Sequence, residues 1–109
     1  MILTVDLGTS VTKGAVWGAE GLLALASAPL ETEHPAPGLA EQDPADWWSS
    51  VLHVCSRLGA ELPGGLRTVT VVGLTGARQT FSLFDGSGRA LVPGILWSDR
   101  RAAQEAAHL

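Results

Sequence analysis

The sequence predicts an α/β domain, on three patterns found along its 109 residues. Short apolar runs rich in strand-forming residues alternate with tight turns over residues 2–28. Residues 44–62 then carry apolar side chains at helical spacing, and a β-rich run follows at residues 68–75. Strands on both sides of a helix are typical of mixed α/β domains.

Three strands are expected in the first part of the chain. Residues 2–7 form an apolar run that ends at a Gly-Thr-Ser turn at residues 8–10. Residues 11–17 resume a strand pattern, residues 18–21 turn the chain again, and residues 22–28 predict a third strand. Because the connecting turns are tight, these strands are predicted to form an antiparallel meander.

A helix is expected after a proline-containing loop at residues 29–43. Asp43 suits the N-cap and Pro44 suits the first helical position, where its missing N–H costs nothing. The apolar stripe of this helix comprises Trp47, Val51, Val54, Cys55, Leu58 and Leu62. Trp47 and Trp48 are both expected to pack in the core, and the Pro-Gly-Gly at residues 63–65 is expected to end the helix.

The rest of the chain is predicted to alternate extended segments and turns. After the strand at residues 68–75, residues 81–84 predict another strand and residues 85–88 a turn. Residues 93–97 are expected to be extended, and Asp99 is expected to be the N-cap of a last helix. No Gly or Pro ends that helix, so the sequence is expected to be a fragment or a truncated form.

Composition and charge argue against several function classes. The net charge of -4 argues against a protein that binds the phosphate backbones of nucleic acids. Cys55 is the single cysteine, so no internal disulfide can form and a reducing compartment is expected. The sequence shows no secretory signal and no apolar run of the ~18 residues that span a bilayer. Residues 1–109 are therefore expected to form one domain at most, or part of one, in the cytoplasm, without nucleic-acid or membrane partners.

The first turn gathers the residue types that phosphoryl transfer requires. A carboxylate such as Asp6 can hold Mg²⁺ directly or through water. Gly8 allows the backbone to approach phosphate oxygens. The hydroxyls of Thr9 and Ser10 can donate further hydrogen bonds, and Lys13 can neutralise phosphate charge.

The spacing in this turn excludes a P-loop, the commonest nucleotide-binding loop of this kind. A P-loop has Gly-x-x-x-x-Gly-Lys-Ser/Thr and runs into a helix. Here Lys13 follows Gly8 by five residues, and the chain continues as a strand. On these residues alone, a plain hairpin turn next to an aspartate stays the alternative interpretation.

Four segments together resemble a known family. They are residues 5–13 (Val-Asp-Leu-Gly-Thr-Ser-Val-Thr-Lys), 38–48 (Gly-Leu-Ala-Glu-Gln-Asp-Pro-Ala-Asp-Trp-Trp), 73–80 (Gly-Leu-Thr-Gly-Ala-Arg-Gln-Thr) and 95–101 (Ile-Leu-Trp-Ser-Asp-Arg-Arg). In this order they resemble the phosphate motif, the Glu-Gln-Asp-Pro helix opening, the Gly-Gln-Met-His-Gly segment and the Trp-x-Asp-x-Arg segment of the FGGY carbohydrate kinases. The resemblance covers essentially the whole chain.

This resemblance implies a ribonuclease H-like (actin-like ATPase) fold, with this chain as the N-terminal part of the first of two such domains. It also implies ATP-dependent, Mg²⁺-assisted phosphorylation of a sugar or polyol hydroxyl. Carried over by position, Asp6 would hold the metal. Gly8, Thr9, Ser10 and Lys13 would bind the ATP phosphates, and Arg78, Gln79, Trp97 and Asp99 would lie near the sugar.

The same resemblance places the catalytic base and the adenine pocket beyond residue 109. Within the chain, Asp99 is a less favoured candidate for the base. The isolated chain is therefore expected to be inactive, and its partners are the rest of the kinase, ATP and the sugar or polyol. The assembly state is left open, a homodimer included.

The residues expected near the sugar leave the substrate open. Residues 77–79 are Ala-Arg-Gln, which differs from the Gln-Met-His of xylulokinases and is also similar to the Arg-Glu pair of glycerol kinases. Gln79 keeps a hydrogen-bond acceptor for a hydroxyl but lacks the negative charge of glutamate. The acceptor could be a ketopentose, another sugar or a polyol.

A second function class is compatible with the same residues. The chain could belong to a non-catalytic module of ribonuclease H-like fold that binds nucleotide or sugar. An actin- or chaperone-like ATPase would share residues 6–10, but residues 41–44 and 97–100 argue against it. The presence of an aspartate beyond residue 109 that faces the acceptor hydroxyl would decide for the enzyme.

Overall fold

The computed structural model describes residues 1–108, which divide into two compact units. The sheet unit comprises residues 1–30 and 45–77. The loop unit comprises residues 31–44 and the chain from residue 78 onward. Within residues 1–108, no helix is both long enough and apolar enough to cross a membrane.

The sheet unit contains a four-stranded mixed sheet in the order β3-β2-β1-β5. Strands β1 (Ile2–Leu7), β2 (Val11–Gly18) and β3 (Gly21–Pro29) pair antiparallel in sequence order, which confirms the predicted meander. Strand β5 (Val71–Gly76) then pairs in parallel with β1. The predicted strand at residues 68–75 starts later because a 3-10 helix, η1 (Gly65–Thr68), occupies its first position.

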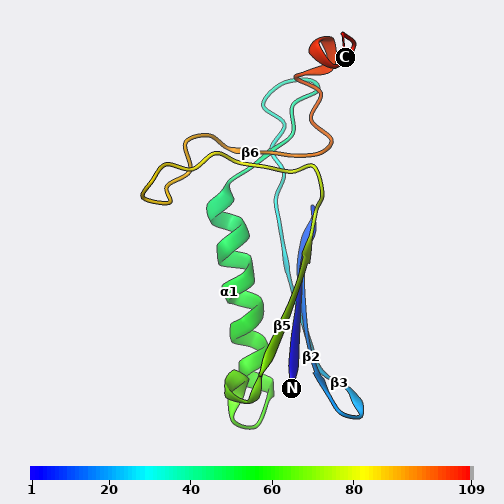
Figure 1. Ribbon diagram of the computed structural model, residues 1–109, viewed down its shortest axis with the longest axis vertical. Helices are drawn as coiled ribbons and strands as arrows, with labels where there is room; N and C mark the ends of the chain where they lie inside the picture. The colour runs from blue at the N-terminus through cyan, green and yellow to red at the C-terminus, as the bar shows by residue number, and fades with distance from the viewer. Residues whose placement is uncertain (109) are drawn as a thin grey trace. The chain divides into compact units, whose positions relative to one another are not determined.

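Helix α1 (Pro44–Glu61) connects β3 to β5 and lies along one face of the sheet (Figure 1). Its first residue is Pro44, as predicted, and Asp43 directly precedes it. The core between helix and sheet consists of apolar side chains from both. These are Leu3, Val5, Val16, Ala24, Ala26, Ala28, Val54, Leu58 and Leu62.

Gly14 on β2 allows α1 to approach the sheet closely. A Cβ atom at this position would lie 2.4 Å from Cγ1 of Val54 and 3.0 Å from Cδ1 of Leu58. Both side chains belong to the fully buried part of the core. The distance between α1 and the sheet is therefore set by a residue that has no side chain.

The two tryptophans at the start of α1 have different environments. Trp47 lies on the predicted stripe and is half-buried, but Trp48 is 64% exposed. The expectation that Trp48 packs in the core is wrong because adjacent helical residues point about 100° apart, which takes it off the stripe.

The opposite face of the sheet is apolar and exposed. Ile2 on β1 pairs with Trp17 on β2 and with Val71 on β5, and all three side chains are exposed. Leu22 and Leu25 on β3 continue this surface. In the described part of the chain, the sheet therefore buries one face against α1 and presents the other to solvent.

The loop unit has little regular structure. Strand β4 (Glu41–Gln42) pairs antiparallel with β6 (Gly94–Ile95), inside the predicted extended segment at residues 93–97. The predicted strand at residues 81–84 is wrong, because only isolated bridges form there, from Phe81 to Ile95 and from Phe84 to Ala90.

The turn predicted at residues 85–88 is confirmed, and Asp85 organises it. Its Oδ1 accepts hydrogen bonds from the backbone N–H groups of Ser87 (2.9 Å) and Arg89 (3.0 Å). The Ser87 hydroxyl donates to the same oxygen at 2.6 Å. These bonds, the one from the Ser87 hydroxyl first, hold the pKa of Asp85 below its usual value.

The predicted cap of the last helix is wrong. Helix α2 (Ala103–Ala106) has Ala102 at its N-cap position, three residues after Asp99. Oδ1 of Asp99 instead accepts the backbone N–H of Arg101 at 2.9 Å. An aspartate that binds the N–H two residues ahead forms a turn of its own, so the helix starts later.

Substitution of Gly14 tests the close approach of α1. Gly14→Ala forces a methyl group against Val54, and overpacking of this kind costs about 1–3 kcal/mol. The rate of hydrogen exchange at α1 amides in the full-length protein should rise by the factor that this loss of free energy corresponds to. Gly86→Ala is the matched control, because a Cβ atom there meets nothing within 4 Å. Equal exchange in both variants would contradict this packing.

Candidate functional site

The carboxyl ends of β1 and β5 meet at one edge of the sheet. Their parallel register pairs Asp6 with Thr75 and Leu7 with Gly76. One residue further, the backbone N–H of Ala77 donates to the carbonyl oxygen of Leu7 at 2.9 Å. The turn that follows β1 and the segment that leaves β5 therefore start from neighbouring points, and Arg78 is the next residue in the chain.

The turn at residues 8–10, here called the phosphate hairpin, is fixed by backbone hydrogen bonds. Gly8 N–H donates to the carbonyl of Val11 at 3.1 Å, and Leu30 N–H donates to the carbonyl of Ser10 at 2.9 Å. A Cβ atom on Gly8 would lie 2.9 Å from the Val11 carbonyl oxygen, so this position requires glycine. The missing side chain of Gly8 thus lets the turn close, with its N–H bonded to the Val11 carbonyl.

Asp6 and Lys13 face each other across the β1–β2 ladder. Both are exposed and line a pocket of about 370 Å³ on the sheet face away from α1. Thr75 adds a hydroxyl to the lining, and Leu25 adds apolar surface. The pocket combines one carboxylate and one ammonium group, one residue pair away from the Leu7–Thr12 pair at the base of the phosphate hairpin.

The donor set near Asp6 fits a metal that brings most of its own ligands. Among residues 1–108, no three His, Cys, Asp or Glu side chains lie close enough together to hold a metal ion. Mg²⁺ binds through one or two carboxylates and otherwise keeps waters and substrate phosphates. A single exposed carboxylate beside a glycine turn therefore suits Mg²⁺ only if the ion keeps most of its other ligands.

Behind the phosphate hairpin, two hydroxyl groups are buried between β2 and α1. Oγ1 of Thr12 lies 2.6 Å from Oγ of Ser50, and the Ser50 hydroxyl donates to the carbonyl of Trp47 at 2.8 Å. Sequence patterns did not predict this pair. The signal was present, since Ser50 falls between Trp47 and Val54 on the stripe that otherwise holds apolar residues.

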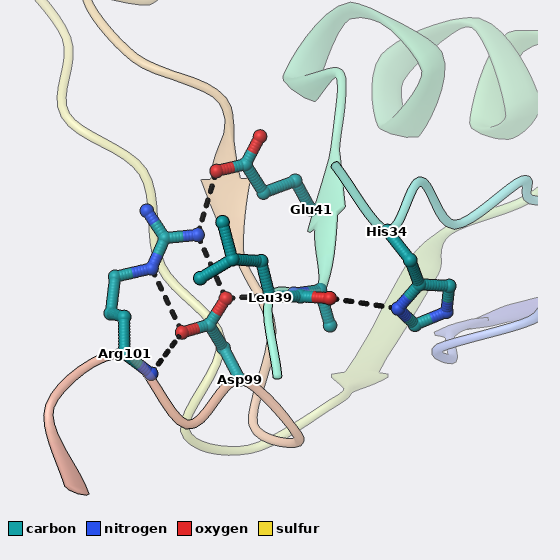
Figure 2. A network of polar contacts seen from close by, with 6 residues as sticks. His34, Leu39, Glu41, Asp99 and Arg101 are labelled. Carbon is teal, nitrogen blue, oxygen red and sulfur yellow. Dashed lines mark hydrogen bonds and ion pairs between the residues drawn. The ribbon is translucent and has the colours of Figure 1, made fainter. Parts of the chain in front are cut away.

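In the loop unit, Asp99 is the centre of a polar network (Figure 2). Its Oδ2 accepts the backbone N–H of Ala40 at 2.7 Å and a guanidinium N–H of Arg101 at 2.7 Å. Its Oδ1 accepts Nε–H of Arg101 at 2.8 Å. Arg101 also donates to Oε1 of Glu41 at 2.6 Å, so it joins two acidic side chains far apart in sequence.

The network changes the ionisation of both partners. The side-chain hydrogen bonds of Arg101 hold the pKa of Asp99 well below its usual range, although burial of the carboxyl group opposes this. The same bonds raise the pKa of Arg101. Only 2% of the Asp99 side chain is exposed. A carboxylate with a low pKa and with both oxygens bonded is a poor base, which argues against Asp99 as the catalytic base.

Two of the residues predicted near the sugar lie on neighbouring segments of the loop unit. Phe81 bridges to Ile95, and the backbone N–H of Trp97 donates to Oγ1 of Thr80 at 3.3 Å. The exposed Gln79 and the 59% exposed Trp97 therefore belong to adjacent segments. Gln79 has φ 58°, the one positive φ of a non-glycine residue among residues 1–108. Such backbone strain is concentrated at functional sites.

Comparison with known proteins assigns the chain to a family. The sequence profile of the N-terminal domain of the FGGY family of carbohydrate kinases matches residues 1–109. The chain belongs to the FGGY family. The predicted resemblance is therefore confirmed.

Several FGGY kinases are similar over nearly the whole chain. A glycerol kinase from Methylobacterium nodulans is 34% identical over 100% of this chain and 22% of its own length. A xylulose kinase from Escherichia coli K12 is 35% identical over 96% of this chain and 22% of its own length. A solved structure of a xyloylose kinase from Brucella ovis superposes with a TM-score of 0.92 at 36% identity, over 97% of this chain and 22% of its own.

These comparisons confirm the predicted fold and bound its extent. The FGGY neighbours share the mixed sheet and helix described above, so the ribonuclease H-like (actin-like ATPase) α/β fold is confirmed. The chain spans 22% of the length of these relatives and corresponds to their N-terminal part. The roles of the individual site residues stay predictions.

Removal of the Arg101 guanidinium should raise the pKa of Asp99. Arg101→Gln removes the main cause of the lowered pKa, the side-chain hydrogen bonds of Arg101, so the carboxyl should titrate closer to its ordinary range in a ¹³C NMR titration. With a lowered pKa, ionised Asp99 stabilises the fold above the ordinary carboxyl pKa. That stabilisation is lost as the pH falls through the lowered pKa, and Arg101→Gln should move this loss to higher pH.

Arg89→Gln provides the matched control at Asp85. The Arg89 side chain is the smallest cause of the lowered pKa of Asp85, behind the Ser87 hydroxyl and the backbone N–H groups. The Asp85 pKa should therefore move less than that of Asp99. An Asp99 pKa that is the same in wild type and Arg101→Gln would contradict the described network.

Proposed function

We propose that the full-length protein transfers the γ-phosphoryl group of ATP to a hydroxyl group of a sugar or polyol. The observation that carries this proposal is the carboxyl edge of β1 and β5. There a carboxylate, a glycine turn and an ammonium group meet in a chain of the FGGY carbohydrate kinase family. Phosphoryl transfer depends on positioning and on stabilisation of charge, which these groups supply.

The phosphate hairpin is proposed to bind the ATP phosphates. Gly8 lets the hairpin turn close tightly. The hydroxyls of Thr9 and Ser10 in this turn would offer hydrogen bonds to phosphate oxygens. Lys13 is exposed on the strand that leaves the hairpin, so its charge faces the same pocket as Asp6. Bound phosphate groups would then lie between these hydroxyl groups and one cation.

Asp6 is proposed to hold Mg²⁺, directly or through water. When bound, the ion would neutralise part of the charge on the phosphates. The exposed carboxylate at the end of β1 is suited to this role because no packing contact of the core requires it. Asp6 would also fix the position of the nucleotide relative to the hairpin.

Arg78, Gln79 and Trp97 are proposed to bind the acceptor. An indole surface beside polar side chains is suited to a ligand with many hydroxyl groups. Asp99 lies two residues after Trp97, and its contacts with Ala40 and Arg101 would keep that segment in place. The contact of Asp99 with the sugar stays a prediction.

The substrate stays open between a sugar and a polyol. The relatives named above are a glycerol kinase at 34% identity and a xylulose kinase at 35%, so overall similarity does not separate them. Gln79 offers an amide oxygen and an amide N–H₂, which can bind hydroxyl groups of either class. A panel of ketoses, aldoses and polyols is the direct test.

The rest of the kinase is proposed to supply the catalytic base and the adenine pocket. Family members named above are about 4.5 times as long as this chain, from its 22% share of their length. Free Cys55 is compatible with action in the reducing cytoplasm. By itself the chain would leave the phosphate hairpin open to water, which weakens electrostatic stabilisation of the transition state. The isolated chain should therefore show no sugar-dependent ATP consumption.

Asp6→Asn should abolish most of the activity of the full-length protein. The amide keeps the size of the side chain but loses the charge that holds the metal, so kcat should fall by at least about 100-fold. Asp46→Asn is the control, because Asp46 is an exposed acid in the first turn of α1. Turnover of Asp6→Asn within a few-fold of wild type would rule out the proposed role. If the wild-type protein binds nucleotide but turns over none of the acceptors, the non-catalytic module is favoured.

Gln79→Asn should weaken binding of the acceptor alone. Asparagine tolerates positive φ, so the backbone at this position can stay as it is while the amide is drawn back by one methylene group. The KM for the sugar should rise by about ten-fold, with the KM for ATP changed by less than about two-fold. A rise in the KM for ATP with an unchanged KM for the sugar would place this segment at the nucleotide instead.

A further inference from the structure

We infer that Thr12 and Ser50 are positioning residues that hold the phosphate hairpin in its ATP-binding conformation. The inference rests on the proposed function and adds to it two side chains that touch neither substrate. Both are buried: Thr12 is 0% exposed and Ser50 is 6% exposed. They can act on the phosphates only through the backbone of the hairpin.

The donor and the acceptor of the hydrogen bond between Thr12 and Ser50 can be assigned. The Ser50 hydroxyl has a single hydrogen, and it donates this hydrogen to the carbonyl oxygen of Trp47 at 2.8 Å. Ser50 Oγ must therefore accept at the other contact, so Thr12 donates at 2.6 Å. The result is a short chain of hydrogen bonds from β2 through Ser50 to the first turn of α1.

This chain of hydrogen bonds joins the base of the hairpin to the helix. Thr12 pairs with Leu7 across the β1–β2 ladder, and this is the last pair before the hairpin begins. On its other side, Thr12 pairs with Ala28 of β3. A shift of β2 along α1 would break the bond to Ser50, whereas an apolar contact would tolerate a small shift.

Neighbouring residues on the same strands carry the groups proposed to bind phosphate. Lys13 follows Thr12 and Asp6 precedes Leu7, and both side chains face the side of the sheet away from α1. Because side chains alternate along a strand, fixing Thr12 against the helix also fixes the direction of Lys13. The buried pair thus controls the hairpin and both charged groups at its base.

The surrounding core makes a hydroxyl pair unexpected on packing grounds. Further along the same faces of β2 and α1, Val16, Val54 and Leu58 are fully buried. Burial of hydroxyl groups has a desolvation cost that apolar side chains avoid, and it is acceptable here because both are hydrogen-bonded. What the pair adds is a defined position of α1 relative to β2, which matters for a turn that must match a phosphate group.

The test compares substitutions of the pair in the full-length protein. Thr12→Val keeps the shape of the side chain and removes its donor, and Ser50→Ala removes the acceptor. The KM for ATP and the Kd of ADP in the presence of Mg²⁺ should each rise by at least about five-fold, while the KM for the sugar changes by less than about two-fold. Thr12→Ser restores the hydroxyl and should return both nucleotide constants to within about two-fold of wild type.

Ser49→Ala is the matched control for Ser50→Ala. Ser49 is the adjacent residue of α1, it is exposed, and its substitution has the same effect on helix propensity. A role in stability alone would lower the unfolding midpoint of Thr12→Val and Ser50→Ala and leave both nucleotide constants as in wild type. That result would overturn the inference.

The proposed function can fail separately from this inference. If wild type binds ADP but phosphorylates no acceptor, the proposed function fails, and the change in ADP affinity still decides on Thr12 and Ser50. If wild type is active and the variants bind nucleotide as wild type does, the inference alone fails. If wild type neither turns over nor binds nucleotide, both are overturned.

Discussion

Strand β5 pairs in parallel with β1 over the full length of both strands, and the arrangement of the sheet unit depends on this pairing. Parallel strands end at the same edge, so the turn after β1 and the segment after β5 leave the sheet side by side. A crossover connection is needed to reach a parallel strand, and α1 provides it. The proposed phosphate site at this edge therefore depends on the same topology that buries the core.

The two faces of the sheet have different surroundings. Gly14, Thr12 and Val16 of β2 face α1 and define the contact between helix and sheet. Residues between them, such as Lys13, face the other side, where the pocket next to Asp6 lies. Side chains alternate between the two faces along β2. The strand can therefore pack against α1 with one face and present the polar side chains next to the pocket on the other.

Sequence patterns were sufficient to predict those elements whose formation depends on neighbouring residues in the chain. The meander follows from short apolar runs and tight turns, and α1 begins at Pro44 because proline suits the first helical position. The roles of Asp6 and the hairpin glycine stay predictions, made because their residue types and spacing fit phosphate chemistry. Trp48 was wrongly placed although the helical period itself points it outward.

Long-range contacts could not be predicted from local patterns. Glu41 and Arg101 are 60 residues apart, and Thr12 and Ser50 are 38 residues apart, so their contacts depend on the complete fold. Asp99 has the residue type of an N-cap, but tertiary contacts with Ala40 and Arg101 take up its carboxylate. Residues 81–84 have a strand-like composition, but they find only isolated bridging partners in the loop unit.

The most direct measurement is the position of the bound nucleotide relative to the phosphate hairpin. In the full-length protein with ADP and Mn²⁺ in place of Mg²⁺, the paramagnetic ion should broaden the amide NMR signals of Gly8, Thr9 and Ser10 strongly. The amides of Gly64 and Gly65, beyond the other end of α1, should stay sharp. Sharp signals at the phosphate hairpin together with broadening at another surface would contradict a phosphate site at the carboxyl edge of β1 and β5.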